Sequence, residues 1–222
     1  MKPIDDLKTR LPKLYSENSC DHNLAHIRRV VKRAQIIGQA ERAQLSILLP
    51  AAMLHDISLE KGTLHVTNKH HATLGAKKAK VILEDCGFAN VPQICRVIRQ
   101  HSIDSPTNEP RTLEGDCLFD ADKLDAITPL GVARILQESA LDENRGPVET
   151  AKRLLKWLKA VRFKTRTGRA MGRDRQEAMG FCEAIIRCAR IQPASGKPLN
   201  VLIQDTTAKR PRNKIARYSE AA

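Results

Sequence analysis

The sequence predicts an all-α protein, with one helical bundle followed by a flexible, basic C-terminal tail. Apolar residues recur every three or four positions along most of the chain, which is the spacing of a helix with one buried face. No convincing run alternates apolar and polar residues, as a half-buried strand would. The expected organisation is an N-terminal extension over residues 1–19, one domain over 20–192 and a tail over 193–222.

Two helices are expected at the start of the domain. Helical spacing over residues 24–40 predicts a helix that carries His26 near its beginning. A second helix is expected over 43–56, where Pro50 should kink it or mark a new start because proline lacks an N–H. Residues 57–70 show no clear period and are expected to form a loop.

Further helices are expected after this loop. Helical spacing predicts a helix over 71–86, and Gly87 is well placed to terminate it. Asn90-Val-Pro92 is a helix start signal, since asparagine can cap a helix and proline is tolerated in its first turn. That helix delivers His101 near its end. Helical spacing then returns in four more segments, residues 113–126, 130–140, 148–163 and 173–190.

The positive charge is concentrated in the last third of the chain. The formal net charge is +13, yet residues 1–150 hold 20 basic and 20 acidic residues. Residues 151–175 hold ten basic residues against one acid, and the remaining 47 residues hold eight against four. Such a block suggests an anionic partner, either a phosphorylated substrate or a nucleic acid. A solvated helix face with a basic tail would give the same composition.

Composition also indicates the compartment. The six cysteines lack CxxC spacing and are interpreted as reduced thiols. No segment approaches the roughly 20 apolar residues needed to span a membrane. We therefore expect a cytoplasmic protein with no membrane association.

The adjacent pair His55-Asp56 is the most informative feature for function. It ends an apolar run that begins at Ile47, so both side chains should lie at the edge of the core. Burying them costs free energy unless they have a partner, and a divalent cation is an obvious one. His26 and Asp122 are candidates for the remaining ligands. Two imidazoles and two carboxylates suit Mn, Mg, Fe, Co, Ni or Zn.

The motifs around these residues resemble the HD-domain phosphohydrolase superfamily, named for its His-Asp pair. The chain is most similar to small stand-alone bacterial members that resemble nucleotide phosphohydrolases. The resemblance covers about residues 20–190. Five motifs occur in one order: His22-Asn-Leu-Ala-His26-Ile-Arg-Arg29-Val30, Ala51-Ala-Met-Leu-His55-Asp56-Ile57, His70-His71, Ile98-Arg-Gln-His101-Ser102, and Glu114-Gly through Asp120-Ala-Asp122-Lys-Leu-Asp125-Ala.

The resemblance implies a metal site made by His26, His55, Asp56 and Asp122. Asp122 is preferred to Asp120 because the last ligand of the family stands in an Ala-Asp-basic-Leu context. Asp120 could instead be a helix cap or support a ligand from behind.

Other residues of the motifs are implied to contact substrate or a second metal. Some members of the superfamily use additional histidines for a second metal and others use them to hold phosphate, and His71 and His101 could take either role. Asp125 lies on the same helix face as Asp122, so it could orient a ligand or contact substrate. His22, one turn before His26, could support the site or lie exposed at the helix start.

The resemblance implies hydrolysis of a phosphoester or phosphoanhydride in a nucleotide or similar small phosphorylated molecule. A divalent metal would activate water. Asp56 could serve both as a ligand and as the acceptor of the water proton. Arg29 and Lys61 are candidates to stabilise charge that develops on phosphoryl oxygens.

Two features leave other functions open. The basic C-terminal third could bind nucleic acid, as a binding module with a structural metal or as a nuclease; steep salt dependence lost on deletion of 193–222 would identify this function. Thr128-Pro129 stands where the family usually has small residues, which could reshape the pocket wall.

Overall fold

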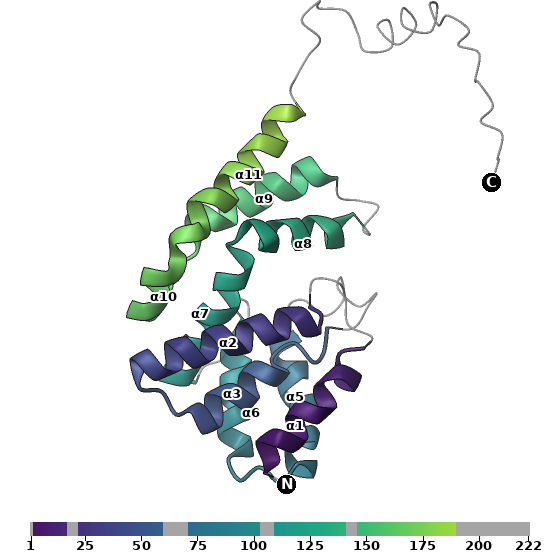
Figure 1. Ribbon diagram of the computed structural model, residues 1–222, viewed down its shortest axis with the longest axis vertical. Coiled ribbons are helices and arrows are strands. Elements are labelled where there is room, and N and C mark those ends of the chain that lie inside the picture. The colour runs from purple at the N-terminus through teal and green to yellow at the C-terminus, as the bar shows by residue number, and fades with distance from the viewer. Residues whose placement is uncertain (1, 17–21, 60–70, 103–108, 141–145, 190–222) are drawn as a thin grey trace, which may run out of the picture. The chain divides into compact units, whose positions relative to one another are not determined.

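The computed structural model describes residues 2–16, 22–59, 71–102, 109–140 and 146–189. These residues form ten α-helices and one short 3-10 helix, with no strand among them, so the all-α prediction is confirmed (Figure 1). The chain divides into two units, residues 1–186 and 187–222. The predicted tail, residues 193–222, lies outside the described residues.

The first three helices all contribute to the core. They are α1 (Pro3–Leu14), α2 (Leu24–Glu41) and α3 (Leu45–Leu54). Helix α3 is apolar almost throughout and is largely buried, and it continues across Pro50 instead of restarting there. The sequence analysis did not predict α1. Its Leu7 and Leu11, one turn apart, are buried in the common core, so the N-terminal segment contributes to the bundle.

Three further helices surround α3. They are α5 (His71–Asp85), α6 (Val91–Gln100) and α7 (Leu113–Ala126). Helix α5 packs on α6, both α6 and α7 pack on α3, and α7 also packs along α2. Gly87 follows α5 with a φ of 77°, as a terminating glycine should. Asn90 precedes α6 as expected, but its side chain makes no capping hydrogen bond.

The remaining helices are α8 (Pro129–Ser139), α9 (Pro147–Ala160), α10 (Arg166–Met171) and α11 (Arg175–Cys188), with a 3-10 turn at Gly172–Asp174. Threonine caps set three helix starts: Thr112, Thr128 and Thr165 each accept a hydrogen bond from the N–H three residues later. The sequence analysis did not predict α10, which is too short for a periodic signal.

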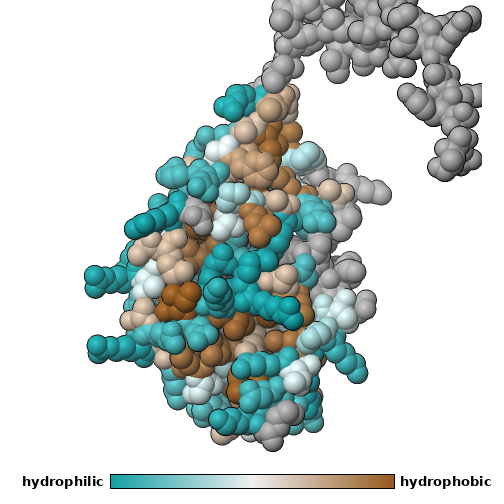
Figure 2. All heavy atoms as spheres, in the orientation of Figure 1, coloured by the Kyte–Doolittle hydropathy of each residue, from teal (hydrophilic) through white to brown (hydrophobic). Residues whose placement is uncertain are grey.

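The described surface is chemically mixed. Figure 2 shows hydrophilic and hydrophobic side chains interspersed on the visible face. The large exposed hydrophobic residues come from five helices: Ile36, Leu74, Val81, Leu113, Leu130 and Phe181. Among the described residues, none of the helices combines the length and apolarity that crossing a bilayer requires. The five described cysteines are free thiols.

Candidate metal centre

His26 is held at the first turn of α2. The side-chain oxygen of Asn23 accepts hydrogen bonds from the backbone N–H groups of Ala25 and His26, at 3.0 and 3.1 Å. The His26 ring is buried, and its Nδ1 lies 2.8 Å from Oδ2 of Asp125. An ionised carboxylate can only accept, so Nδ1 donates and the opposite nitrogen, Nε2, presents a lone pair.

His55 and Asp56 lie immediately after α3 and are almost completely buried. Nδ1 of His55 donates to the backbone carbonyl of Ala52 at 2.9 Å. A neutral imidazole that donates through Nδ1 has its lone pair on Nε2. His55 therefore presents the same atom as His26.

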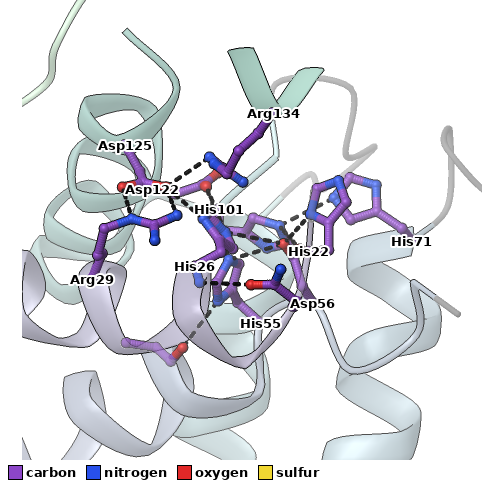
Figure 3. Close-up of polar contacts among 12 residues, drawn as sticks. His22, His26, Arg29, His55, Asp56, His71, His101, Asp122, Asp125 and Arg134 are labelled. Carbon is purple, nitrogen blue, oxygen red and sulfur yellow. Dashed lines mark hydrogen bonds and ion pairs between the residues drawn. The ribbon is translucent and has the colours of Figure 1, made fainter. Parts of the chain in front are cut away.

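Four side chains from α2, the end of α3 and α7 converge (Figure 3). Oδ2 of Asp56 lies 3.5 Å from Nε2 of His26 and 3.2 Å from Nε2 of His55. Oδ1 of Asp122 lies 3.6 and 3.9 Å from the same two nitrogens. Ligand atoms about 2.0–2.2 Å from one ion are separated by about 3–4 Å. The structure therefore brings these four residues to within the spacing of one cation site.

The two imidazoles provide a test of whether a cation fits. Nε2 of His26 and Nε2 of His55 are both buried, and neither has a hydrogen-bond partner among the described residues. A buried polar atom without a partner costs free energy, and a cation placed between these nitrogens and the carboxylates would remove that cost. The donor set of nitrogen and carboxylate oxygen thus fits a divalent metal.

The electrostatics also favour positive charge at this place. Burial would raise the pKa of Asp56, but the nearby His55 and His22 hold it well below its usual value. Burial likewise opposes ionisation of Asp122, but the charge of Lys123, whose Nζ lies 2.6 Å from Oδ2, lowers its pKa. Both carboxyl groups are therefore ionised near neutral pH. Two buried negative charges require neutralisation.

His71 and His101 form a second group around the other oxygen of Asp56. Oδ1 of Asp56 lies 3.4 Å from Nε2 of His101, and Nε2 of His71 lies 3.1 Å from the same nitrogen. Nδ1 of His101 is engaged by the backbone carbonyl of Ile98 at 2.6 Å. Burial lowers the pKa of His101 to about 4, so the ring is neutral near pH 7. Asp56, His71 and His101 are close enough to hold a metal ion.

The carboxylate of Asp125 contacts the far side of the His26 ring and also pairs with three arginine side chains. Besides His26, it accepts hydrogen bonds from Nε of Arg29 at 2.8 Å and from Arg134 at 2.7 Å, and it pairs with Arg33. Its side chain is 1% exposed. The structure thus places Asp125 as a support for a histidine, and it pairs Arg29 with a carboxylate.

The neighbouring acid on α7 faces elsewhere. Asp120 accepts hydrogen bonds from the backbone N–H groups of Lys164 and Thr165, at 2.8 and 2.7 Å, and from the Thr165 hydroxyl. It therefore fastens the connection between α9 and α10, whereas Asp122 reaches the histidines. Lys61, proposed from the sequence as a catalytic cation, lies outside the described residues.

Sequence reasoning did not identify two residues of this site, Arg33 and Arg134. Both join Asp125. A signal was present for Arg33, because it stands one turn after Arg29 on the same helix face. For Arg134 the partner lies across a helix junction, and nothing in its local sequence indicated the contact.

Comparisons with known proteins agree with this geometry. The family model of the HD domain matches residues 23–127, which include the four convergent residues. The uncharacterized protein YpgQ of Bacillus subtilis is 27% identical over 137 residues. The match covers 60% of this chain and 65% of that relative's length.

Solved structures share the fold. The crystal structure of Bacillus subtilis YpgQ in complex with ADP is 23% identical, with a TM-score of 0.58, covering 83% of this chain and 97% of that chain. A predicted HD superfamily hydrolase from an uncultured Thermotogales bacterium is 26% identical, with a TM-score of 0.55, covering 82% and 91%. An HD-superfamily hydrolase from Bacillus thuringiensis is 23% identical, with a TM-score of 0.58, covering 85% and 97%. Residues 23–127 of the chain thus match the HD domain family, and the solved structures with this fold include HD-superfamily hydrolases.

Proposed function

We propose that this protein is a metal-dependent phosphohydrolase that acts on a nucleotide or a similar small phosphorylated molecule. The observation that carries the proposal is the pair of buried Nε2 atoms of His26 and His55, which have no hydrogen-bond partner among the described residues and face two ionised carboxylates. The metal would be held by these two histidines with Asp56 and Asp122. Such an ion supplies acidification of water and polarisation of a phosphoryl oxygen.

The protein residues have separate tasks in this reaction. Asp56 accepts the proton of the attacking water, since its carboxylate is ionised. His101 is neutral, and with His71 it either holds a phosphoryl oxygen or completes a second metal site. Arg29 contributes positive charge beside His26, reduced by its pairing with Asp125. Lys61 remains a candidate cation for the phosphoryl group.

The similar structures support both the type of reaction and the class of substrate. Relatives of this fold are named HD-superfamily hydrolases, and the YpgQ structure contains ADP. A nucleotide also agrees with the excess of positive charge in the C-terminal third, because phosphates are polyanions.

The test is phosphate or pyrophosphate release by the metal-loaded full chain from a panel of nucleotides and phosphoesters. His55→Ala and Asp56→Asn should abolish release while circular dichroism stays helical. Asp116→Asn, an acid on α7 that pairs with Arg111, is the matched control and should retain activity. Absence of release from every compound with every divalent metal would refute the proposal.

Nucleic acid is a second candidate partner, favoured by the basic C-terminal third, in which residues 151–175 hold ten basic residues against one acid and the remaining 47 residues hold eight against four. Here the same centre would act on a nucleic acid, or the metal would be structural. Binding of a duplex or RNA should then weaken steeply with salt and disappear on deletion of residues 193–222. No binding at low salt would eliminate this candidate.

A further inference from the structure

His22 stands directly before the cap residue of α2, and its ring reaches the candidate centre. Asn23 fixes the first turn through two hydrogen bonds, so the backbone positions of His22 and His26 are set together. Their rings lie edge to face with centroids 5.8 Å apart. Figure 3 shows His22 beside Asp56, on the side of the cluster that also holds His71.

The contact between His22 and Asp56 is short, and only one of the two groups can be the hydrogen-bond donor. Nδ1 of His22 lies 2.6 Å from Oδ2 of Asp56. A carboxylate oxygen can only accept a hydrogen bond, so Nδ1 of His22 donates to Oδ2 of Asp56. Hydrogen bonds to a carboxylate are short and comparatively strong. The His22 side chain is 24% exposed and that of Asp56 is 4% exposed, so the donor stands at the rim of a buried acceptor.

His22 differs from the other histidines that face Asp56. His26, His55 and His101 each have Nδ1 against another acceptor, so all three present Nε2 to Asp56. His22 alone of these four contacts the carboxylate through Nδ1. His22 therefore donates a hydrogen bond to Asp56, whereas the neutral forms of the other three histidines have an Nε2 lone pair available for a metal.

Both oxygens of the Asp56 carboxylate face histidines. Oδ2 faces His26 and His55 while Oδ1 faces His101. Rotation about the bond that carries the carboxylate would disturb both relationships at once. A hydrogen bond to Oδ2 fixes that rotation. Oδ2 would use one lone pair to bind the metal, and this hydrogen bond would satisfy its second lone pair.

We propose that His22 is a positioning residue for Asp56, which it holds in the orientation that serves both histidine groups. This inference rests on the proposed function, in which Asp56 is a metal ligand. The alternative is that His22 is itself a ligand, since its ring nitrogen lies close to ligand atoms of His26 and Asp56. Two atoms bound to one ion at about 2.0–2.1 Å are separated by about 2.9 Å or more. The 2.6 Å contact fits a hydrogen bond better.

Three substitutions of His22 separate these roles. The side-chain amide nitrogen of asparagine can occupy the place of Nδ1, whereas that of glutamine reaches the place of Nε2. His22→Asn should therefore keep the hydrogen bond, while His22→Gln and His22→Ala should lose it. Arg28→Gln, an exposed residue of α2, is the matched control.

The measurement is the Kd of Mn²⁺ for the EDTA-stripped full chain by titration calorimetry, followed by kcat and KM. His22→Ala and His22→Gln should weaken Mn²⁺ binding about 10–100-fold and lower kcat more than they raise KM. His22→Asn should stay within about threefold of wild type. Thermal unfolding of the metal-free variants identifies any general loss of folding.

Each contrary outcome has a definite meaning. Wild-type Mn²⁺ affinity in His22→Ala would overturn the positioning role. Equal loss in His22→Asn and His22→Ala would overturn it too, in favour of direct ligation by the imidazole. If His22→Ala does not fold, the comparison of His22→Asn with His22→Gln decides. A wild-type chain that binds no divalent metal would instead refute the proposed function, and this inference with it.

Discussion

Asp125 accepts a hydrogen bond from Nδ1 of His26 at 2.8 Å and thereby selects the tautomer that exposes Nε2 to the candidate metal centre. The two residues come from α7 and α2, which pack along one another. The same carboxylate engages Arg29 and Arg134. One buried acid thus orients a candidate ligand and joins three helices.

Removing this charge should destabilise the fold. Asp125→Asn leaves Arg29, Arg33 and Arg134 without their shared anion, and breaking a fully buried pair costs about 3–5 kcal/mol. Arg29 and Arg33 are 29% and 22% exposed, so we expect a smaller loss, about 2–4 kcal/mol at pH 7. Urea unfolding of the metal-free protein measures it.

The effect of Asp125→Asn should depend on pH. Burial opposes ionisation of Asp125, but hydrogen bonds from His26 and Arg29 outweigh it and hold its pKa well below 3.8. A depressed pKa stabilises the folded state above the unfolded value, and this contribution is lost as pH falls through the folded value. The difference from wild type should shrink below about pH 4. A constant difference from pH 7 to pH 3 would contradict this.

Asp120 and Asp122 should respond in opposite ways to the same change. Asp120→Asn places an amide donor against the N–H groups of Lys164 or Thr165, so stability should fall by about 1–3 kcal/mol while Mn²⁺ affinity is kept. Asp122→Asn should lower Mn²⁺ affinity at least tenfold with little loss of stability in EDTA. Calorimetry and urea unfolding give both quantities, and a metal defect in Asp120→Asn would reverse the assignment.

Removing the His71 imidazole should lower kcat/KM more than it lowers the Mn²⁺ affinity of the site formed by His26, His55, Asp56 and Asp122. His71→Ala should leave the tightest Mn²⁺ site within about threefold of wild type and lower kcat/KM about 10–100-fold. Metal stoichiometry would then show whether a second ion is lost. Lys77→Ala, an exposed residue of the same helix, should match wild type. Unchanged kcat/KM in His71→Ala would remove this residue from the site.

Stabilisation by metal should grow as pH rises. Burial opposes protonation of His55, but the charges of Asp56 and Asp122 raise its pKa above 6.5. In metal-free protein, protonated His55 contributes stability that is present below about pH 6.5 and is lost as pH rises through the folded pKa. Metal requires the neutral imidazole. The Tm difference between Mn²⁺ and EDTA samples should therefore widen from pH 6 to pH 8.5, and a constant difference would count against it.

Thr128 should act as a helix cap. Its hydroxyl accepts from the N–H of Gly131 and donates to the backbone carbonyl of Asp125, both at 3.0 Å. Thr128→Ala should cost about 1 kcal/mol without changing Mn²⁺ affinity, and Thr128→Ser should restore the stability. A large change in metal affinity would instead agree with an altered pocket wall.

The helices were predicted where periodicity is long and its ends are marked. The helix expected over 113–126 has the same bounds as α7, which has a threonine cap and a dense apolar pattern. The sequence predicts only an extension over the segment that forms α1, although its Leu7 and Leu11 have helical spacing. α10 was missed because six residues give no period.

For the candidate site too, the sequence predicted some relationships between residues and not others. Motif order indicated that His26, His55, Asp56 and Asp122 belong together, and the structure brings them together. The sequence indicated that Arg33 shares a helix face with Arg29, but not that either arginine, or Arg134, pairs with Asp125. Arg33 stands 92 residues from it and Arg134 stands nine residues away across a helix junction, so both contacts depend on how helices pack.

The Tyr15 hydroxyl donates to the backbone carbonyl of Met53 at 2.8 Å, two residues before His55. Tyr15 follows α1 and lies before the region that matches the HD domain family. A fragment expressed from residue 20 onward would lose this bond and uncover the apolar surface under Leu7 and Leu11. The segment upstream of the family match thus contacts and supports the backbone just before His55 and Asp56. Protein prepared for metal studies should therefore include residues 1–19.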